Sequence, residues 1–195
     1  KEIVLDKDYT VQYFDNTNVG TATISLRGIG NYTGTITKTF MISQAPITSI
    51  ILMENNYNYD GTEKQPEVIV YAGEVQLVNG IDYQLVYSDN VKPGIGNATV
   101  VGIGNYIGSI TDTFAINLAS LTEMILSQNS YVYDGTEKKP NVTVKCGDVQ
   151  LVQGTDYTVT YKNNVNVGIG TVEVQACGAY QGVLSKTFTI KPISI

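Results

Sequence analysis

The chain has 195 residues, 12 lysines and arginines, 18 aspartates and glutamates, and a net charge of -6. Arginine occurs once, at Arg27, which argues against a nucleic-acid-binding surface. Histidine is absent, so Ser-His-Asp and Cys-His catalysis and histidine-ligated metals are excluded. No apolar run reaches the length of a membrane span, and no signal peptide is visible, so we expect no membrane insertion.

A gap-free repeat with a period of 74 residues explains the whole chain: Tyr59 recurs as Tyr133, and Phe114 as Phe188. We predict a partial, C-terminal half repeat over 1–42, complete repeats over 43–116 and 117–190, and the start of the next linker over 191–195. Below, these are the first, second and third copies. An alternative keeps the period but shifts the structural unit circularly, so that the last copy is incomplete.

Within a copy, residues 68–72 and 83–87 alternate in the manner of strands, and glycine-rich turns separate the segments. The closing strand is predicted to point Ile110, Phe114 and Ile116 inward and to leave Asp112 near the rim, because an isolated buried carboxylate is costly. No segment has a helical period. Six or seven short strands per copy predict an all-β fold of the sandwich or barrel type.

Residues that recur in the copies are interpreted as structural, because a feature present in every repeat usually serves the common fold. The aspartates are expected to cap turns, and the aromatic rings to fill the core or its edge. These repeated structural positions are Asp8, Tyr9, Tyr13, Tyr32, Phe40, Tyr59, Asp82, Tyr83, Tyr87, Tyr106, Phe114, Tyr133, Asp156, Tyr157, Tyr161, Tyr180 and Phe188.

Two motifs mark turns. Tyr59–Thr62 and Tyr133–Thr136 contain Asp-Gly, a tight-turn signature, without the remaining acidic ligands of a calcium loop. Gly28–Tyr32 and Gly102–Tyr106 contain Gly-Ile-Gly-Asn-Tyr, and no helix that could hold a phosphate follows. We therefore expect bends at the sheet edge, no metal site and no cofactor.

Other reactive chemistry has little support. Cys146 and Cys177 replace apolar residues of the preceding copy, so reduced thiols in the core are expected, with a disulfide between them as the alternative. Acid pairs such as Asp6 and Asp8 do not recur in every copy, which argues against a glycosidase and against an enzyme in general. A Lys–Asn cross-link is not expected either, because no lysine recurs at a core position of the strands.

The repeated strings resemble the tandem immunoglobulin-like repeats, including the MBG type, of large bacterial cell-surface proteins. The motifs are Tyr-x-Tyr-x-Gly-x-x-x-x-Pro at Tyr131–Pro140, the Asp-Tyr string at Leu151–Asn164, Gly-x-Gly-Asn-Tyr-x-Gly at Gly28–Gly34 and Thr-x-Thr-Phe-x-Ile at Thr37–Ile42. The resemblance implies elongated tandem β-sandwich modules at the cell surface or in the cell wall. It supplies no catalytic residues, and Ala179 replaces the motif asparagine in the last copy.

Two functions follow as hypotheses. The first is a non-catalytic adhesion or spacer array, whose partners are neighbouring modules of the same chain and host or cell-wall glycans or proteins. The alternative is a carbohydrate-binding module that uses some of the 14 tyrosines, for example Tyr57 or Tyr131, although the tryptophan common in sugar platforms is absent.

The first copy carries a further expectation. Residues 1–42 lack the strands that 43–74 supply in the next copy, so sheet edges are left unpaired. We expect this segment to exchange strands with a neighbouring chain, or to pack as a partial sheet on the second copy.

Overall fold

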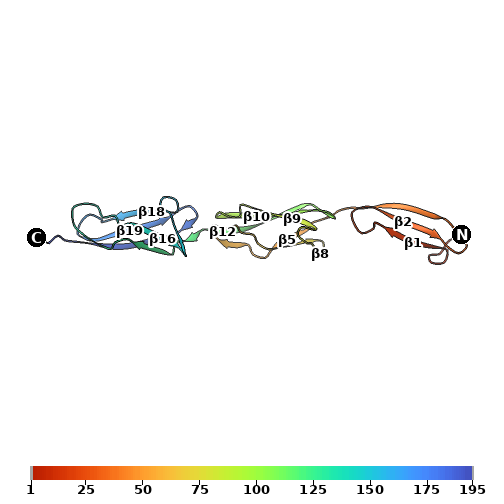
Figure 1. The fold of residues 1–195 in the computed structure, drawn as a ribbon, viewed down its shortest axis with the longest axis horizontal. Helices are drawn as coiled ribbons and strands as arrows, with labels where there is room; N and C mark the ends of the chain where they lie inside the picture. Colours follow the sequence, from red (N-terminus) through yellow and green to blue (C-terminus); the bar gives the residue numbers. More distant parts are fainter. Residues whose placement is uncertain (1, 195) are drawn as a thin grey trace. The chain divides into compact units, whose positions relative to one another are not determined.

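A computed structural model describes residues 2–194; Lys1 and Ile195, the outermost residues of the predicted segments 1–42 and 191–195, lie outside this range. The described residues form 21 strands and no helix (Figure 1). Apolar residues at every second position bury one face of a strand, and the frequent glycines allow the chain to turn. The all-β prediction is confirmed.

The strands of the first copy are β1 (Tyr9–Phe14), β2 (Gly20–Gly28) and β3 (Thr35–Ile42). The next group comprises β4 (Ala45–Pro46), β5 (Ser49–Leu52), β6 (Asn56–Asn58), β7 (Val68–Ala72), β8 (Val75–Gln76), β9 (Tyr83–Ser88), β10 (Gly94–Gly102), β11 (Tyr106–Ile107) and β12 (Ser109–Asn117). The last group comprises β13 (Ala119–Ser120), β14 (Glu123–Leu126), β15 (Ser130–Val132), β16 (Val142–Cys146), β17 (Val149–Gln150), β18 (Tyr157–Lys162), β19 (Gly168–Ala176), β20 (Tyr180–Gln181) and β21 (Val183–Lys191). Strands β16, β18 and β19 begin 74 residues after β7, β9 and β10.

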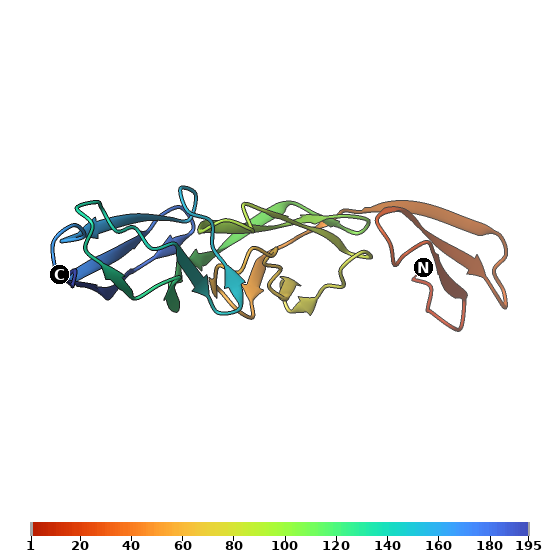
Figure 2. The same ribbon diagram turned by 60° about the vertical axis from the view of Figure 1, so that its left-hand side comes forward.

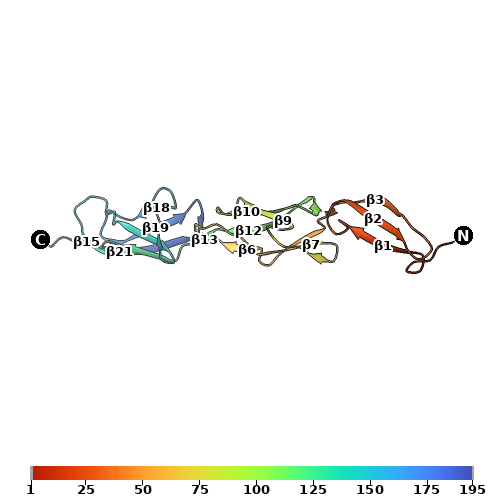
Figure 3. The ribbon, with the colours of Figure 1, turned by 45° about the vertical axis from the view of Figure 1, so that its right-hand side comes forward.

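The strands assemble into several sheets. Strands β1, β2 and β3 form one antiparallel sheet with β2 in the middle (Figure 3). The later strands form two four-stranded sheets, in the orders β6-β12-β10-β9 and β15-β21-β19-β18, and two three-stranded sheets, β5-β7-β8 and β14-β16-β17. In both four-stranded sheets a short edge strand, β6 or β15, runs parallel to the closing strand. The pairs β4-β11 and β13-β20 are two-residue parallel contacts.

The third copy holds one core between its two larger sheets. Met124 and Val144 enter this core from β14 and β16, and Val172, Phe188 and Ile190 enter it from β19 and β21. Each of these side chains is at most 3 % exposed. Two sheets that share one apolar core have the character of a β-sandwich.

The closing strand of the second copy follows its predicted pattern. Phe114 and Ile116 are buried, while Ile110 and Asp112 are half-buried. The carboxylate stays partly in water, as the cost of burying an unpaired charge requires.

The chain divides into two compact units. The first contains the residues before Asn56 together with Gln65–Ser88 and Asn97–Thr113; the second contains Asn56–Lys64, Asp89–Gly96 and the residues from Phe114 onward. This division passes through the second copy, and the copy boundaries stay a sequence-based prediction. Strand β3 ends at its predicted boundary, whereas β12 and β21 each continue one residue beyond theirs.

Candidate functional site

The repeated aspartates stabilise turns. Asp8, Asp82 and Asp156 each accept a hydrogen bond on Oδ2 from the backbone N–H four residues earlier, at 2.8–3.0 Å. This is the turn-capping role expected for them. Their carboxylates are therefore engaged with the backbone.

The repeated tyrosines join the two halves of a copy. The Tyr161 hydroxyl donates to the carbonyl oxygen of Pro140 at 2.7 Å, and Tyr87 makes the same bond to Pro66 at 2.5 Å. Burial raises the pKa of Tyr161, so its phenol stays protonated and keeps donating this bond. The ring of Tyr13, at the equivalent position of the first copy, is 54 % exposed.

The Asp-Gly turns contain a feature that was missed. Lys64 and Lys138, one in each complete copy, are buried at 7 % and 6 % exposure. The Lys64 ammonium donates to Asp60 Oδ1 at 2.5 Å, and this oxygen also accepts from the Thr62 N–H and hydroxyl at 2.8 and 2.7 Å. Lys138, Asp134 and Thr136 repeat the arrangement. The aliphatic part of each lysine is therefore buried while its charge meets an exposed carboxylate.

The expectation that no lysine recurs at a core position concerned the strands only, so it did not cover Lys64 and Lys138. These lysines lie in loops, where the alternation of strand residues says nothing about burial. Each is clamped through its backbone: the Lys138 N–H donates to the Asn164 carbonyl at 2.7 Å, and the Asn164 side-chain amide donates to the Lys138 carbonyl at 3.2 Å. Because the asparagine side chain bonds to the lysine backbone and the lysine ammonium bonds to aspartate, the geometry does not favour a Lys–Asn cross-link.

The Asp134–Lys138 pair gives a pH-dependent stability. The hydrogen bond from Lys138 holds the pKa of Asp134 well below its ordinary value of 3.8, with those from Thr136 adding to the effect. A carboxyl group whose pKa is lower in the folded state than in the unfolded state stabilises the fold at pH values above its unfolded-state pKa. This stabilisation is lost as the pH falls from the unfolded-state pKa through the folded-state pKa. We expect Asp134→Asn to destabilise the third copy near neutral pH and to have a much smaller effect at about pH 2.

Urea unfolding of the chain and the variant at both pH values measures this difference. Asp148→Asn, the same change at an exposed aspartate of the same copy, is the control and should have little effect at either pH. An equal loss of stability at both pH values in Asp134→Asn would contradict the proposed ion pair.

The two cysteines are free thiols and half-buried, so the disulfide considered as an alternative is not formed. Cys177 Sγ donates to the Thr155 carbonyl at 3.3 Å.

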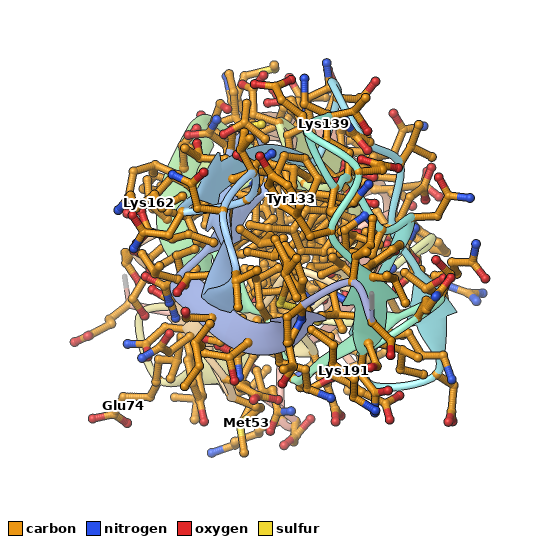
Figure 4. The ribbon with its side chains drawn as sticks, turned by 90° about the vertical axis from the view of Figure 1, so that its left-hand side faces the viewer. Met53, Glu74, Tyr133, Lys139, Lys162 and Lys191 are labelled. Carbon is orange, nitrogen blue, oxygen red and sulfur yellow. The ribbon has the colours of Figure 1, made fainter. Side chains whose placement is uncertain are left out.

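No group of histidine, cysteine, aspartate and glutamate side chains able to hold a metal occurs among residues 2–194. Figure 4 shows Lys139 and Lys162 at the periphery of the molecule, where both form exposed ion pairs with glutamates.

The Gly-Asn-Tyr turns contact the preceding copy. Asn105 Oδ1 accepts from the Val19 N–H, and its Nδ2 donates to Asn18 Oδ1, both at 2.9 Å. In the last copy the asparagine is replaced by Ala179, and the neighbouring Tyr180 packs edge-to-face on Tyr59 with ring centroids 5.7 Å apart. The turn motif therefore supplies contacts between successive copies, by hydrogen bonding in one case and aromatic packing in the other.

Tyr57 and Tyr131 do not form exposed sugar platforms. Each is half-buried and packs edge-to-face on a core phenylalanine: Tyr57 on Phe114 at 5.7 Å and Tyr131 on Phe188 at 5.5 Å. A stacking platform needs a ring face open to the ligand. This packing weighs against the carbohydrate-binding alternative at these two residues.

The sheet β1-β2-β3, drawn in red and orange in Figure 2, has an apolar face that no second sheet covers within residues 2–194. We call it the open face. Its exposed residues include Tyr13, Ile36 and Phe40, which are 54 %, 65 % and 41 % exposed. Next to them lies a hollow of about 270 Å³, lined in part by Ile3 and Tyr9. The assignment of residues 1–42 to half a repeat predicted unpaired sheet edges, but it did not predict the hollow.

No helix in the described part of the chain is long and apolar enough to cross a membrane. Neither the protein-family models nor the curated proteins contain a match to this chain.

Proposed function

We propose that the chain is a string of immunoglobulin-like modules that serves as a non-catalytic spacer or adhesive stalk of a bacterial surface protein, outside the cell. The observation that carries the proposal is that turn residues of the repeat contact the preceding copy: Asn105 bonds to Asn18 and Val19, and Tyr180 packs on Tyr59. Contacts of this kind are what a linear array uses between neighbours. Neighbouring modules are then the partners within the chain.

The chemistry of the repeated groups supports a structural role. The aspartates cap turns or pair with lysine, and burial raises the pKa of Tyr157 and Tyr161. The two phenols therefore stay protonated near neutral pH. Adhesion would then depend on the outer surface of the modules, through contacts with host or cell-wall glycans or proteins.

Small-angle X-ray scattering of the full chain tests the spacer role. We expect a pair-distance distribution with a long tail, as for modules joined end to end. A symmetric, single-peaked distribution at all concentrations would contradict the proposal. The variant Asn105→Ala, which places in this turn the residue found naturally at position 179, is expected to broaden the distribution by loosening the junction.

A further inference from the structure

A hollow of about 640 Å³ lies at the junction of the second and third copies. Three exposed amide side chains line it: Asn58, Asn117 and Gln181. The rest of its lining consists of Pro93, Gly94, Ile116 and Leu118. All of these residues belong to the second compact unit of the chain, and none of them is charged. The volume lies in the range typical of ligand sites.

The fold fixes the places of the three amides. Asn58 and Asn117 are direct partners in the parallel pair β6-β12, so their backbones lie about 4.8 Å apart. Gln181 ends β20, which pairs with β13. The rings of Tyr59 and Tyr180, the sequence neighbours of Asn58 and Gln181, pack edge-to-face and hold the two segments together. A site that is formed before the ligand arrives has a lower entropic cost of binding.

Two of the amides use their nitrogen within the protein. Asn117 Nδ2 donates to the Tyr57 carbonyl at 3.0 Å, and Gln181 Nε2 donates to the Leu118 carbonyl at 3.1 Å. Each NH2 group is thereby held in place, and the carbonyl oxygen of the same amide remains as an acceptor for a ligand. The exposed Asn58 amide can both donate and accept. The hollow therefore offers hydrogen-bonding groups without a charge.

Uncharged donors and acceptors beside apolar surface match the chemistry of a neutral sugar. Each sugar hydroxyl donates and accepts, as amide groups do, and the C–H groups of a sugar ring can pack on Pro93 and Leu118. Leu118 is 37 % exposed, so its surface is accessible. A phosphate or carboxylate ligand would be expected to meet a cationic partner, and the lining of this hollow contains none.

The amides are specific to this junction. At the equivalent positions of the other copies stand Val132 for Asn58, Ser43 and Lys191 for Asn117, and Ile107 for Gln181. A residue that the common fold requires is expected to recur in the repeat. The amides are therefore not needed for the fold of a copy, which leaves them available for recognition.

A second hollow extends the first. It has a volume of about 480 Å³, is lined by the loop Asp89–Ile95, and shares Pro93 and Gly94 with the first hollow. Asp89 and Lys92 give this extension one charge of each sign, so it adds no net charge. Together the two hollows offer room for several sugar rings. The expected ligand is therefore an oligosaccharide rather than a monosaccharide.

We propose that these adjoining hollows bind a neutral oligosaccharide, with Asn58, Asn117 and Gln181 bonding to its hydroxyl groups. The proposal rests on the adhesive role proposed above, for which it supplies the class of ligand and the site. It differs from the sugar platforms considered at Tyr57 and Tyr131, because the contacts come from amides at a junction and not from exposed aromatic rings.

Isothermal titration calorimetry of the full chain tests the proposal, with maltotetraose, cellotetraose, mannotetraose and chitotetraose as neutral probes. At least one of them should bind saturably and one to one. Tetragalacturonic acid, which is charged, should bind more weakly than that probe. With the probe bound, amide exchange should slow in β6, in β20 and at the end of β12.

Two variants locate the site. Asn58→Val and Gln181→Ile introduce the residues of positions 132 and 107, which the repeat accepts there. Each should weaken binding about tenfold, the effect of losing one hydrogen bond to the ligand. Val132→Asn, the reverse change at the equivalent position of the third copy, is the matched control: Val132 is 57 % exposed, and the affinity should not change. Amide exchange of the free variants shows whether the junction stays folded.

Binding that stays undetected for every neutral probe up to about 10 mM would overturn the proposal. Equal affinity of the parent chain and both variants would overturn it as well, and would assign glycan adhesion to another surface. Tighter binding of tetragalacturonic acid than of the neutral probes would make the ligand an acid and would also contradict it. The scattering experiment is separate, since a chain can be extended and still bind none of the probes.

Discussion

Replacing Phe188 by alanine is expected to lower the free energy of unfolding of the third copy by about 3–5 kcal/mol. The same change at Phe40 is expected to cost about 1 kcal/mol or less. The two residues occupy the same position of the repeat, but Phe188 is 2 % exposed and Phe40 is 41 % exposed. Removing the buried ring leaves a cavity between two sheets, whereas removing the exposed ring leaves only a more open surface.

A single denaturation curve would mix the copies, because a chain of several modules need not unfold in one step. Amide exchange read by mass spectrometry separates them. The slowest amides of β19 and β21 should lose protection in Phe188→Ala, while those of β2 and β3 should change little in Phe40→Ala. Equal losses in the two variants would show that a hidden layer covers Phe40.

The strand positions were predictable because they depend on short-range patterns. Apolar residues alternate over 68–72 and 83–87, and the structure has β7 and β9 there. The repeat then carries the prediction forward, since β16 and β18 start 74 residues later. Phe114 could be placed in the core for the same reason: its neighbours Thr113 and Ala115 alternate with it on the strand.

The exposure of Phe40 could not be read from such patterns. Alternation shows which face of a strand is apolar, but not whether a second layer covers that face. The prediction that residues 1–42 are half a repeat was the available signal, and it indicated unpaired edges rather than the depth of the hollow. For the same reason, the sequence predicted unpaired sheet edges in residues 1–42 but did not predict that the apolar face of the sheet is exposed.

The buried lysines were missed for a different reason. Lys64 and Lys138 recur at the repeat spacing, and each follows an aspartate by four residues. This Asp-Gly-Thr-x-Lys pattern is visible in the sequence, but Asp-Gly indicates only a turn, and the alternation of strand residues does not extend into the loop. Burial of a lysine stem in a loop depends on contacts with a distant segment, here Asn90 and Asn164, which no local pattern reports.

Replacing Gly170 by alanine should destabilise the third copy by about 1–3 kcal/mol. This glycine does not adopt a positive φ, so its backbone conformation accepts alanine. The obstacle is the ring of Phe188, whose Cε2 and Cε1 would lie 2.6 and 2.9 Å from the new Cβ. Gly96 stands in the same relation to Phe114, with two ring carbons at 2.5 Å.

A double-mutant cycle separates this clash from a general cost of substitution. In the Phe188→Ala background the ring is gone, so adding Gly170→Ala should cost almost nothing, and the two changes should be strongly non-additive. Additive losses would mean that the methyl group acts on something other than the ring. In the first copy, alanine occupies the position equivalent to Gly170. This residue, Ala22, is fully buried, while Phe40, its partner on the neighbouring strand, is 41 % exposed. Within residues 2–194 no second layer covers the ring of Phe40, so the ring has room to lie away from the methyl group of Ala22.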